Sequence, residues 1–162
     1  MGKAWKFRDS ISTDLIAPGR YFHLRSNLPE LAKHVLEGAR PEFASQVHSG
    51  DFVVAGENFG LGSSREHAPT IIKMAGVKAV LAKSFARIFF RNCINIGLPA
   101  IICNTDEIDE GDELELDMEK GVVRNKTKGK ELDFPPLPQV MNRILQEGGL
   151  VAYIKAHKSM EI

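Results

Sequence analysis

The sequence of 162 residues has no long hydrophobic run, since no apolar stretch approaches the length of roughly 20 residues that a membrane span requires. It also has no net charge, because 21 basic residues balance 21 acidic ones. Bulk electrostatics therefore do not steer the protein toward nucleic acid or an anionic membrane. The N-terminus MGKAWKFRDS has no apolar core of a signal peptide. We expect a cytoplasmic protein with neither a membrane nor a nucleic-acid partner.

Cysteine is equally scarce, because Cys93 and Cys103 are the only two. They are too few and too far apart in sequence to form a metal-ligand cluster, and a cytosolic setting argues against a disulfide between them. The sequence therefore predicts two buried thiols and no metal held by this chain.

What the sequence does contain is an alternation of apolar strands and amphipathic helices, which indicates an α/β fold with parallel strands covered by helices. With 43% hydrophobic residues it is long enough for one well-buried core, so we expect a single domain spanning residues 1–162. The pattern predicts strands at residues 3–7, 51–56, 77–83 and 99–103, helices at 29–38, 64–76 and 84–97, an irregular polar connection at 9–29, half-exposed strands at 112–117, 121–125 and 131–134, a helix at 136–149, and a strand or helical extension at 150–157.

One short stretch between a predicted strand and a predicted helix carries an unusual set of residues: GENFGLGSSREHAP, residues 56–69. Gly60 and Gly62 allow backbone conformations closed to other residues and let a ligand approach the main chain. Two adjacent serines and an arginine follow directly.

Ser63 followed three residues later by Glu66 has the spacing of a capping box, which would start the helix at Ser64. The amides of the first helical turn, the positive end of the helix dipole and the planar guanidinium of Arg65 together favour a carboxylate or a phosphate. A dinucleotide fingerprint fails because Arg65 stands where its third glycine should be, and a Walker loop fails for want of its lysine. An anion-binding turn and a purely structural turn both remain open on these residues alone.

NFGLGSSREHAP followed by GVKAVLAKSFARIFFRNCINIGLPAI resembles the swivelling domain of the aconitase family, in the separate small-subunit form found in 3-isopropylmalate dehydratase and homoaconitase. The resemblance extends upstream through DLIAPGRYF and PELAKHVLEGARPEF, so it covers about Asp9 to about Cys103. It implies a three-layer β/β/α domain. It also implies a hydro-lyase that removes and re-adds water across a malate-type substrate, moving the hydroxyl to the neighbouring carbon.

The resemblance also assigns roles to the residues after the glycines. Ser63 matches the family's catalytic serine, the base that takes a proton from the carbon next to a carboxylate, while Ser64 and Arg65 match residues that hold substrate carboxylates. Simple alternatives are a cap for Ser63 and a solvated helix residue for Ser64. His67 and Gly62 are further candidates for the site. For His67 the alternative is a histidine that is hydrogen-bonded within the first helical turn and has no role in the site.

Arg25, in the early connection, bears on the choice of substrate. In aconitase-type enzymes an arginine in this loop binds a distinguishing carboxylate, whereas apolar residues replace it in isopropylmalate enzymes. Leu24, Arg25 and Ser26 resemble the Leu-Arg-Thr form of homoaconitases. An exposed arginine on a mobile loop is the alternative. We expect 3-isopropylmalate dehydratase of leucine biosynthesis, with a homoaconitase or another 2-alkylmalate or dimethylmalate hydro-lyase as the alternative.

The resemblance further implies a 4Fe–4S cluster whose cysteines lie in a large subunit, so that this chain binds no cofactor and acts only with that partner on a di- or tricarboxylate. The competing hypothesis from another class is a non-catalytic carboxylate- or phosphate-binding module that uses the same turn.

Overall fold

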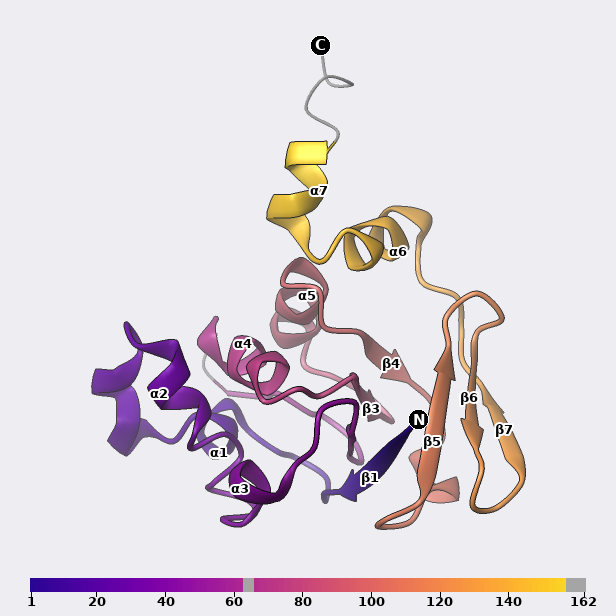
Figure 1. The fold of residues 1–162 in the computed structure, drawn as a ribbon, viewed down its shortest axis with the longest axis horizontal. Coiled ribbons are helices and arrows are strands. Elements are labelled where there is room, and N and C mark those ends of the chain that lie inside the picture. Colours follow the sequence, from indigo (N-terminus) through magenta and orange to yellow (C-terminus); the bar gives the residue numbers. More distant parts are fainter. Residues whose placement is uncertain (63–65, 157–162) are drawn as a thin grey trace.

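A computed structural model of the chain describes residues 1–62 and 66–156. Within these residues seven strands form one mixed sheet in the order β4-β3-β2-β1-β5-β6-β7 (Figure 1). The first four strands along the chain pair in parallel, and the last three pair antiparallel and join the sheet through β1. Their bounds are β1 (Gly2–Lys6), β2 (Phe52–Val54), β3 (Ala79–Ala82), β4 (Ala100–Ile102), β5 (Glu113–Asp117), β6 (Val122–Asn125) and β7 (Lys130–Asp133).

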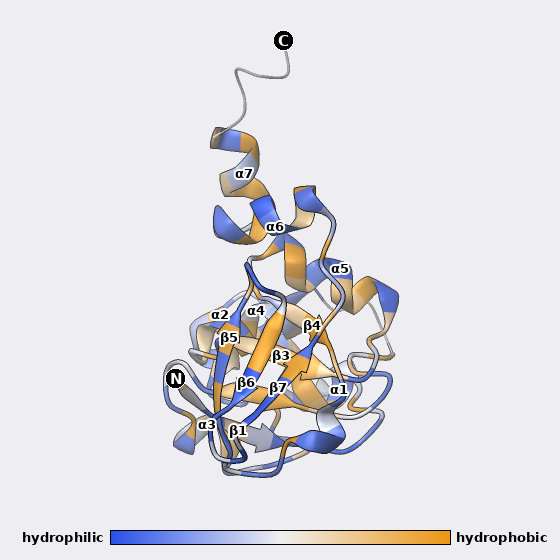
Figure 2. Ribbon diagram, turned by 90° about the vertical axis from the view of Figure 1, so that its right-hand side faces the viewer, coloured by the Kyte–Doolittle hydropathy of each residue, from blue (hydrophilic) through white to orange (hydrophobic). Residues whose placement is uncertain are grey.

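The central parallel strands β2 and β3 bury both of their faces, which explains why their sequences read as continuous apolar runs. On one face, Val53 and Val80 belong to a core shared with the helices. On the other face, Val54 and Leu81 belong to a second core, which Val123 of β6 completes from the antiparallel strands. The central strands are correspondingly orange in Figure 2. The chain therefore has the three layers β/β/α that the resemblance implied.

The helices that share a core with the parallel strands lie on one side of them, whereas η2 (Thr105–Glu107) lies beside the antiparallel strands (Figure 1). The last two helices extend from α5 (Arg87–Asn95) at the edge of the molecule (Figures 1 and 2). No helix within residues 1–62 and 66–156 is long and apolar enough to cross a bilayer. The helical elements are α1 (Thr13–Ile16), η1 (Gly19–Leu24), α2 (Leu28–Ala32), α3 (Phe43–Gln46), α4 (His67–Met74), α5 (Arg87–Asn95), η2 (Thr105–Glu107), α6 (Gln139–Gln146) and α7 (Leu150–Ala156).

The predicted elements differ from the observed ones mainly near the N-terminus. The connection at residues 9–29 contains α1 and η1, which are too short to show a hydrophobic period. The helix predicted at 29–38 ends at Ala32 and continues as turns, although Leu31, Val35 and Leu36 are buried as expected. The helix predicted from Ser64 is described from His67. The segment predicted at 150–157 as a strand or helical extension is helical over Leu150–Ala156, and its last residue lies outside the described residues.

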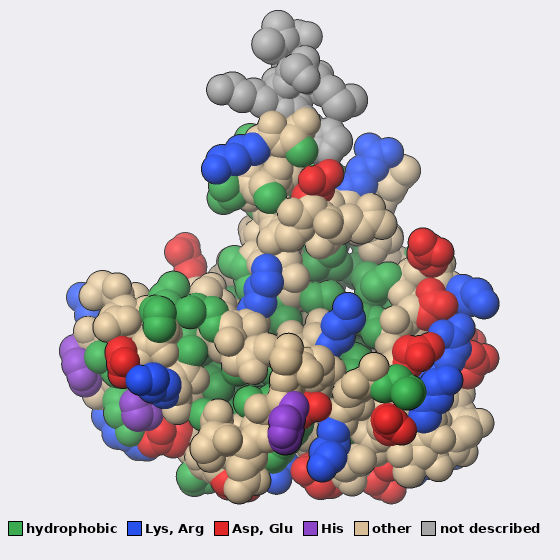
Figure 3. Space-filling model, in the orientation of Figure 1, with side chains coloured by type: hydrophobic (Ala, Val, Ile, Leu, Met, Phe, Trp, Pro, Cys, Tyr) green, Lys and Arg blue, Asp and Glu red, His purple; other side chains and the backbone are tan. Residues whose placement is uncertain are grey.

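Charged side chains of both signs cover the β5–β7 layer (Figure 3). Arg124 of β6 lies at the centre of one such group, and its guanidinium donates hydrogen bonds to Glu115, Asp117 and Glu131 at 2.9, 3.2 and 2.9 Å. Partly exposed ion pairs of this kind contribute little individually to stability. We therefore read this layer as a solvated outer face of the sheet.

Residues 56–62, which follow β2 and are called the glycine turn below, pack directly onto α5. Gly60 has a φ of +86°, and a Cβ atom at this position would lie 2.1 Å from the ring of Phe89. The Gly60 amide donates to the carbonyl of Ile11 at 2.7 Å, and the Phe59 amide donates to the carbonyl of Ser84 at 3.1 Å. The turn is thus fixed on both sides, and only glycine fits at its centre.

We expect Gly60→Ala to lower the free energy of unfolding by about 3 kcal/mol, because it adds backbone strain to a steric clash with the Phe89 ring. Gly129→Ala is the matched control, since Gly129 also has a positive φ of +66° but no atom lies within 4 Å of its Cβ position. The control should lose only about 1 kcal/mol. Chemical denaturation measures both values, and equal losses would mean that the contact with Phe89 does not constrain the turn.

Candidate active site

The carboxyl ends of the parallel strands meet at one edge of the sheet, which is where open α/β sheets bind their ligands. The glycine turn leaves β2 at this edge. Isolated bridges pair Leu61 with Ser12, just before α1, and Phe59 with Phe85, just before α5. The turn therefore lies between the segments that leave β1 and β3.

Gly62 provides exposed backbone at the end of this turn. Its φ is +107°, and a Cβ atom there would lie 3.2 Å from the side-chain oxygen of Thr13. The neighbouring Leu61 carbonyl accepts a hydrogen bond from the Thr13 amide at 2.8 Å. Gly62 has the conformation and the exposure that a ligand-facing turn needs, and contact with a ligand stays a prediction.

Ser63, Ser64 and Arg65, which carry the main predictions for the site, lie outside the described residues. The capping box between Ser63 and Glu66 includes one of these residues and therefore stays a prediction. Among the described residues, Gly62 ends the glycine turn and His67 begins α4. Both of these residues lie at the carboxyl edge of the parallel strands.

Arg25 and His67, both predicted from sequence, come together around one phenylalanine. The Arg25 guanidinium lies over the Phe22 ring, 4.2 Å from its centroid, and donates to the Phe22 carbonyl at 3.1 Å. The same ring meets the His67 ring edge-on, with centroids 6.4 Å apart. Arg25 is exposed, so its charge is available next to the start of α4. The positive end of α4 and this cation both favour an anionic ligand here.

A polar cluster that was not predicted from the sequence holds η1 beside the start of α4. The Glu37 carboxylate accepts hydrogen bonds from Arg20 at 2.6 Å and from the Tyr21 hydroxyl at 2.8 Å, and lies 2.7 Å from Nδ1 of His34. Burial alone would raise the pKa of Glu37, but the bonds from His34, Arg20 and Tyr21 outweigh it and lower the pKa to about 2. The spacing of His34 and Glu37, three residues apart, was the one local signal for this cluster.

A second group of charges lies where β3 and β4 end. Lys83 and Asp106 form an ion pair at 2.6 Å, and this hydrogen bond raises the pKa of Lys83 and lowers the pKa of Asp106, so both remain charged. Nearby, the Asp9 carboxylate accepts a hydrogen bond from the Glu57 amide in the glycine turn at 2.7 Å. These contacts fix the loops that frame the edge.

The described part of the chain contains no group of three or more His, Cys, Asp or Glu side chains placed to hold a metal ion. Cys93 and Cys103 are both buried, as predicted. Burial raises the pKa of each thiol, that of Cys103 to about 12, so neither supplies the thiolate that an iron–sulfur cluster requires. The residues described here do not fit a cluster.

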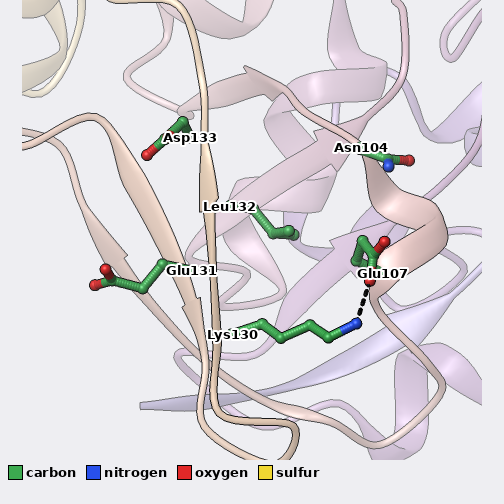
Figure 4. A pocket seen from close by; sticks show the side chains of 6 residues that line it. All are labelled: Asn104, Glu107, Lys130, Glu131, Leu132 and Asp133. Atoms are coloured by element: carbon green, nitrogen blue, oxygen red, sulfur yellow. Dashed lines mark hydrogen bonds and ion pairs between the residues drawn. The ribbon is translucent and has the colours of Figure 1, made fainter.

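A surface pocket is present away from the glycine turn, between η2 and β7 (Figure 4). Lys130 and Leu132 of β7 point toward Glu107 of η2, whereas Glu131 and Asp133 point to the other side of the strand (Figure 4). The ammonium of Lys130 is paired with Glu107 at 2.6 Å. The Glu107 carboxylate thus neutralises the Lys130 cation, which gives this pocket little attraction for an anionic substrate. The pocket is therefore not the candidate active site.

The Aconitase C-terminal domain family model matches residues 7–105 of this chain. The chain is 64% identical over 162 residues to 3-isopropylmalate dehydratase small subunit 2 of Archaeoglobus fulgidus, with 100% of this chain and 98% of that protein covered. It is 63% identical over 159 residues to 3-isopropylmalate dehydratase small subunit 1 of Thermotoga maritima, with 98% and 96% covered. It is also 57% identical over 150 residues to the methanogen homoaconitase small subunit of Methanothermobacter thermautotrophicus, with 93% and 87% covered.

The fold is likewise similar to a solved structure. The crystal structure of 3-isopropylmalate dehydratase from Methanocaldococcus jannaschii superposes with a TM-score of 0.94 at 48% sequence identity, covering 99% of this chain and 95% of the other. The family model, the relatives over nearly their full length and the superposition agree with the fold described above. The chain therefore belongs to the aconitase C-terminal domain family, in the group of free-standing small subunits.

Proposed function

We propose that this chain is the small subunit of a hydro-lyase that isomerises 3-isopropylmalate by dehydration and rehydration, as a step of leucine biosynthesis in the cytoplasm. The observation that carries the proposal is the identity of 64% and 63% to 3-isopropylmalate dehydratase small subunits over almost the whole chain. The small-subunit form of these relatives supports a large subunit as the partner. We assign the iron–sulfur cluster to that partner, where it would bind the substrate hydroxyl and a carboxylate.

In the proposed reaction Ser63 is the base that takes the proton from the carbon next to a substrate carboxylate. A serine oxygen needs its negative charge stabilised before it can accept that proton. The amides that follow the glycine turn, the positive end of α4 and Arg65 would provide this stabilisation, and Ser64 and Arg65 would hold the carboxylates. The position of the glycine turn supports this assignment, because the turn follows β2 at the edge where ligands of α/β sheets bind.

A second candidate substrate is a homocitrate-type tricarboxylate. Two observations favour keeping it: the 57% identity to a methanogen homoaconitase small subunit, and the exposed guanidinium of Arg25 beside the start of α4. A cation is favourable beside a third carboxylate and costly to bury beside an isopropyl group without a partner. The position of Arg25 therefore bears directly on substrate choice.

We expect Ser63→Ala, assayed in a complex with a large subunit, to lower kcat by several orders of magnitude with little change in KM, because the serine oxygen acts in proton transfer. Arg65→Lys should instead raise KM, since a lysine cannot reproduce the bidentate contact of a guanidinium with a carboxylate. If Ser63→Ala turns over at the parent rate and loses only about 0.5–2 kcal/mol of stability, the serine is a helix cap and not a base.

Arg25→Val should change substrate preference and leave the fold intact. If Arg25 faces the substrate, kcat/KM for a homocitrate-type substrate falls, while kcat/KM for isopropylmalate is kept or rises. Arg143→Val, which replaces an exposed arginine on α6, is the matched control and should change neither value. Equal effects of Arg25→Val on both substrates, or no effect on either, would remove Arg25 from the site.

A further inference from the structure

Phe22 of η1 and Arg25, the residue that follows η1, lie beside the start of α4, and η1 is held with little help from the hydrophobic core. None of its residues, Gly19–Leu24, is buried, and Tyr21 and Leu24 are only partly covered by the core. Phe22 is 47% exposed. Apolar packing is the usual means of fixing a helix, so another interaction must set the orientation of this one.

The Glu37 carboxylate provides that interaction. One of its oxygens accepts hydrogen bonds from Arg20 and from the Tyr21 hydroxyl, which are consecutive residues of η1. The other oxygen lies 2.7 Å from Nδ1 of His34, whose ring stacks on the Tyr21 ring with centroids 3.7 Å apart and planes 14° apart. Two residues of η1 are therefore bound through three contacts that converge on Glu37 and His34.

The backbone that carries Glu37 is fixed by its neighbouring residue. The preceding residue, Leu36, is fully buried, and its amide donates to the carbonyl of Ile16 in α1 at 2.8 Å. Leu36 also has a φ of +56°, a conformation that is unfavourable for a residue with a branched side chain. Strain of this kind persists only where the surroundings enforce it, so the backbone next to Glu37 is held in one conformation.

The other side of η1 meets the candidate site. Phe22 is the next residue after Tyr21, and its ring contacts His67 at the start of α4 and lies beneath the Arg25 guanidinium. A rotation of η1 about its contacts with Glu37 would move both Phe22 and Arg25 away from α4. The orientation of these two side chains thus depends on a carboxylate that does not itself reach the site.

We propose that Glu37 is a positioning residue: it holds η1 so that Phe22 and Arg25 stand against the start of α4, where they set the affinity for the non-reacting part of the substrate. This inference rests on the proposed function for its kinetic consequence, but not for its structural part. The lowered pKa of Glu37 keeps the carboxylate ionised at neutral pH, so it remains a strong acceptor under the conditions of the reaction.

The kinetic test uses Glu37→Ala in the complex with a large subunit. Small misplacements of a binding group are costly, so we expect kcat/KM to fall roughly 10- to 100-fold. The loss should appear as a raised KM with kcat nearly unchanged, because the displaced groups bind the substrate but do not react. Glu30→Ala is the matched control: it removes an exposed carboxylate that pairs with Lys33 and leaves the contacts of Glu37 with η1 in place, so its KM should equal that of the parent.

Two further variants separate positioning from a general loss of stability. Tyr21→Phe removes only the hydroxyl bond to Glu37 and keeps the ring stack, so it should raise KM in the same direction by a smaller factor. With a homocitrate-type substrate, the rise in KM of the double variant Glu37→Ala with Arg25→Val should not exceed that of the stronger single variant, because both changes act through the position of Arg25. Additive effects would contradict action through Arg25.

Hydrogen exchange tests the structural part on the isolated chain without any activity. In Glu37→Ala the amides of residues 19–27 should exchange faster than in the parent, while those of β2 and β3 should not change. Unchanged exchange in residues 19–27 overturns the proposal, whatever the kinetics. A parent complex that lacks hydro-lyase activity would instead refute the proposed function, and the exchange result would still decide whether Glu37 holds η1.

Discussion

The geometry of the candidate site depends on having glycine at position 60, because a side chain there would collide with the Phe89 ring. Because no Cβ is present, the glycine turn approaches the Phe89 ring of α5, and its amides reach the carbonyl of Ile11 on the other side. This contact joins the segments that leave β1, β2 and β3 at the edge of the sheet where ligands bind. The chain therefore leaves Gly62 in a fixed place before α4 begins, which is the condition for a serine pair in between to act in catalysis.

The central fold was predictable because its physical signals are local. Strands buried on both faces read as apolar runs, and Gly76 and Gly97, both with positive φ, follow the helices α4 and α5 as predicted. The elements α1 and η1 were missed because helices of four and six residues carry too little hydrophobic period to be recognised. The early end of α2 could not be foreseen either, since the burial of Val35 and Leu36 depends on turns that are set by tertiary contacts.

The site was predictable in composition but not in geometry. The serines and Arg65 were identified through the family resemblance, and they remain predictions because they lie outside the described residues. The structure adds that Arg25 and His67, which are 42 positions apart in sequence, share contact with Phe22. No local sequence pattern predicts such a contact, and none predicts the hydrogen bond from the Tyr21 hydroxyl to Glu37, 16 residues away. Long-range side-chain contacts of this kind decide where a binding group points, and they follow from the tertiary fold.

In the proposed function, this chain binds the anionic substrate through the glycine turn, its cations and the helix amides. Its buried thiols do not suit a cluster. The active enzyme of this proposal is therefore divided between two chains. The most direct test is to assay dehydration of 3-isopropylmalate with this chain alone, with a large subunit reconstituted anaerobically with iron and sulfide, and with both together. The account predicts that only the mixture is active. Activity of this chain alone on any malate derivative, or an inactive mixture whose large subunit carries an intact cluster, would contradict it.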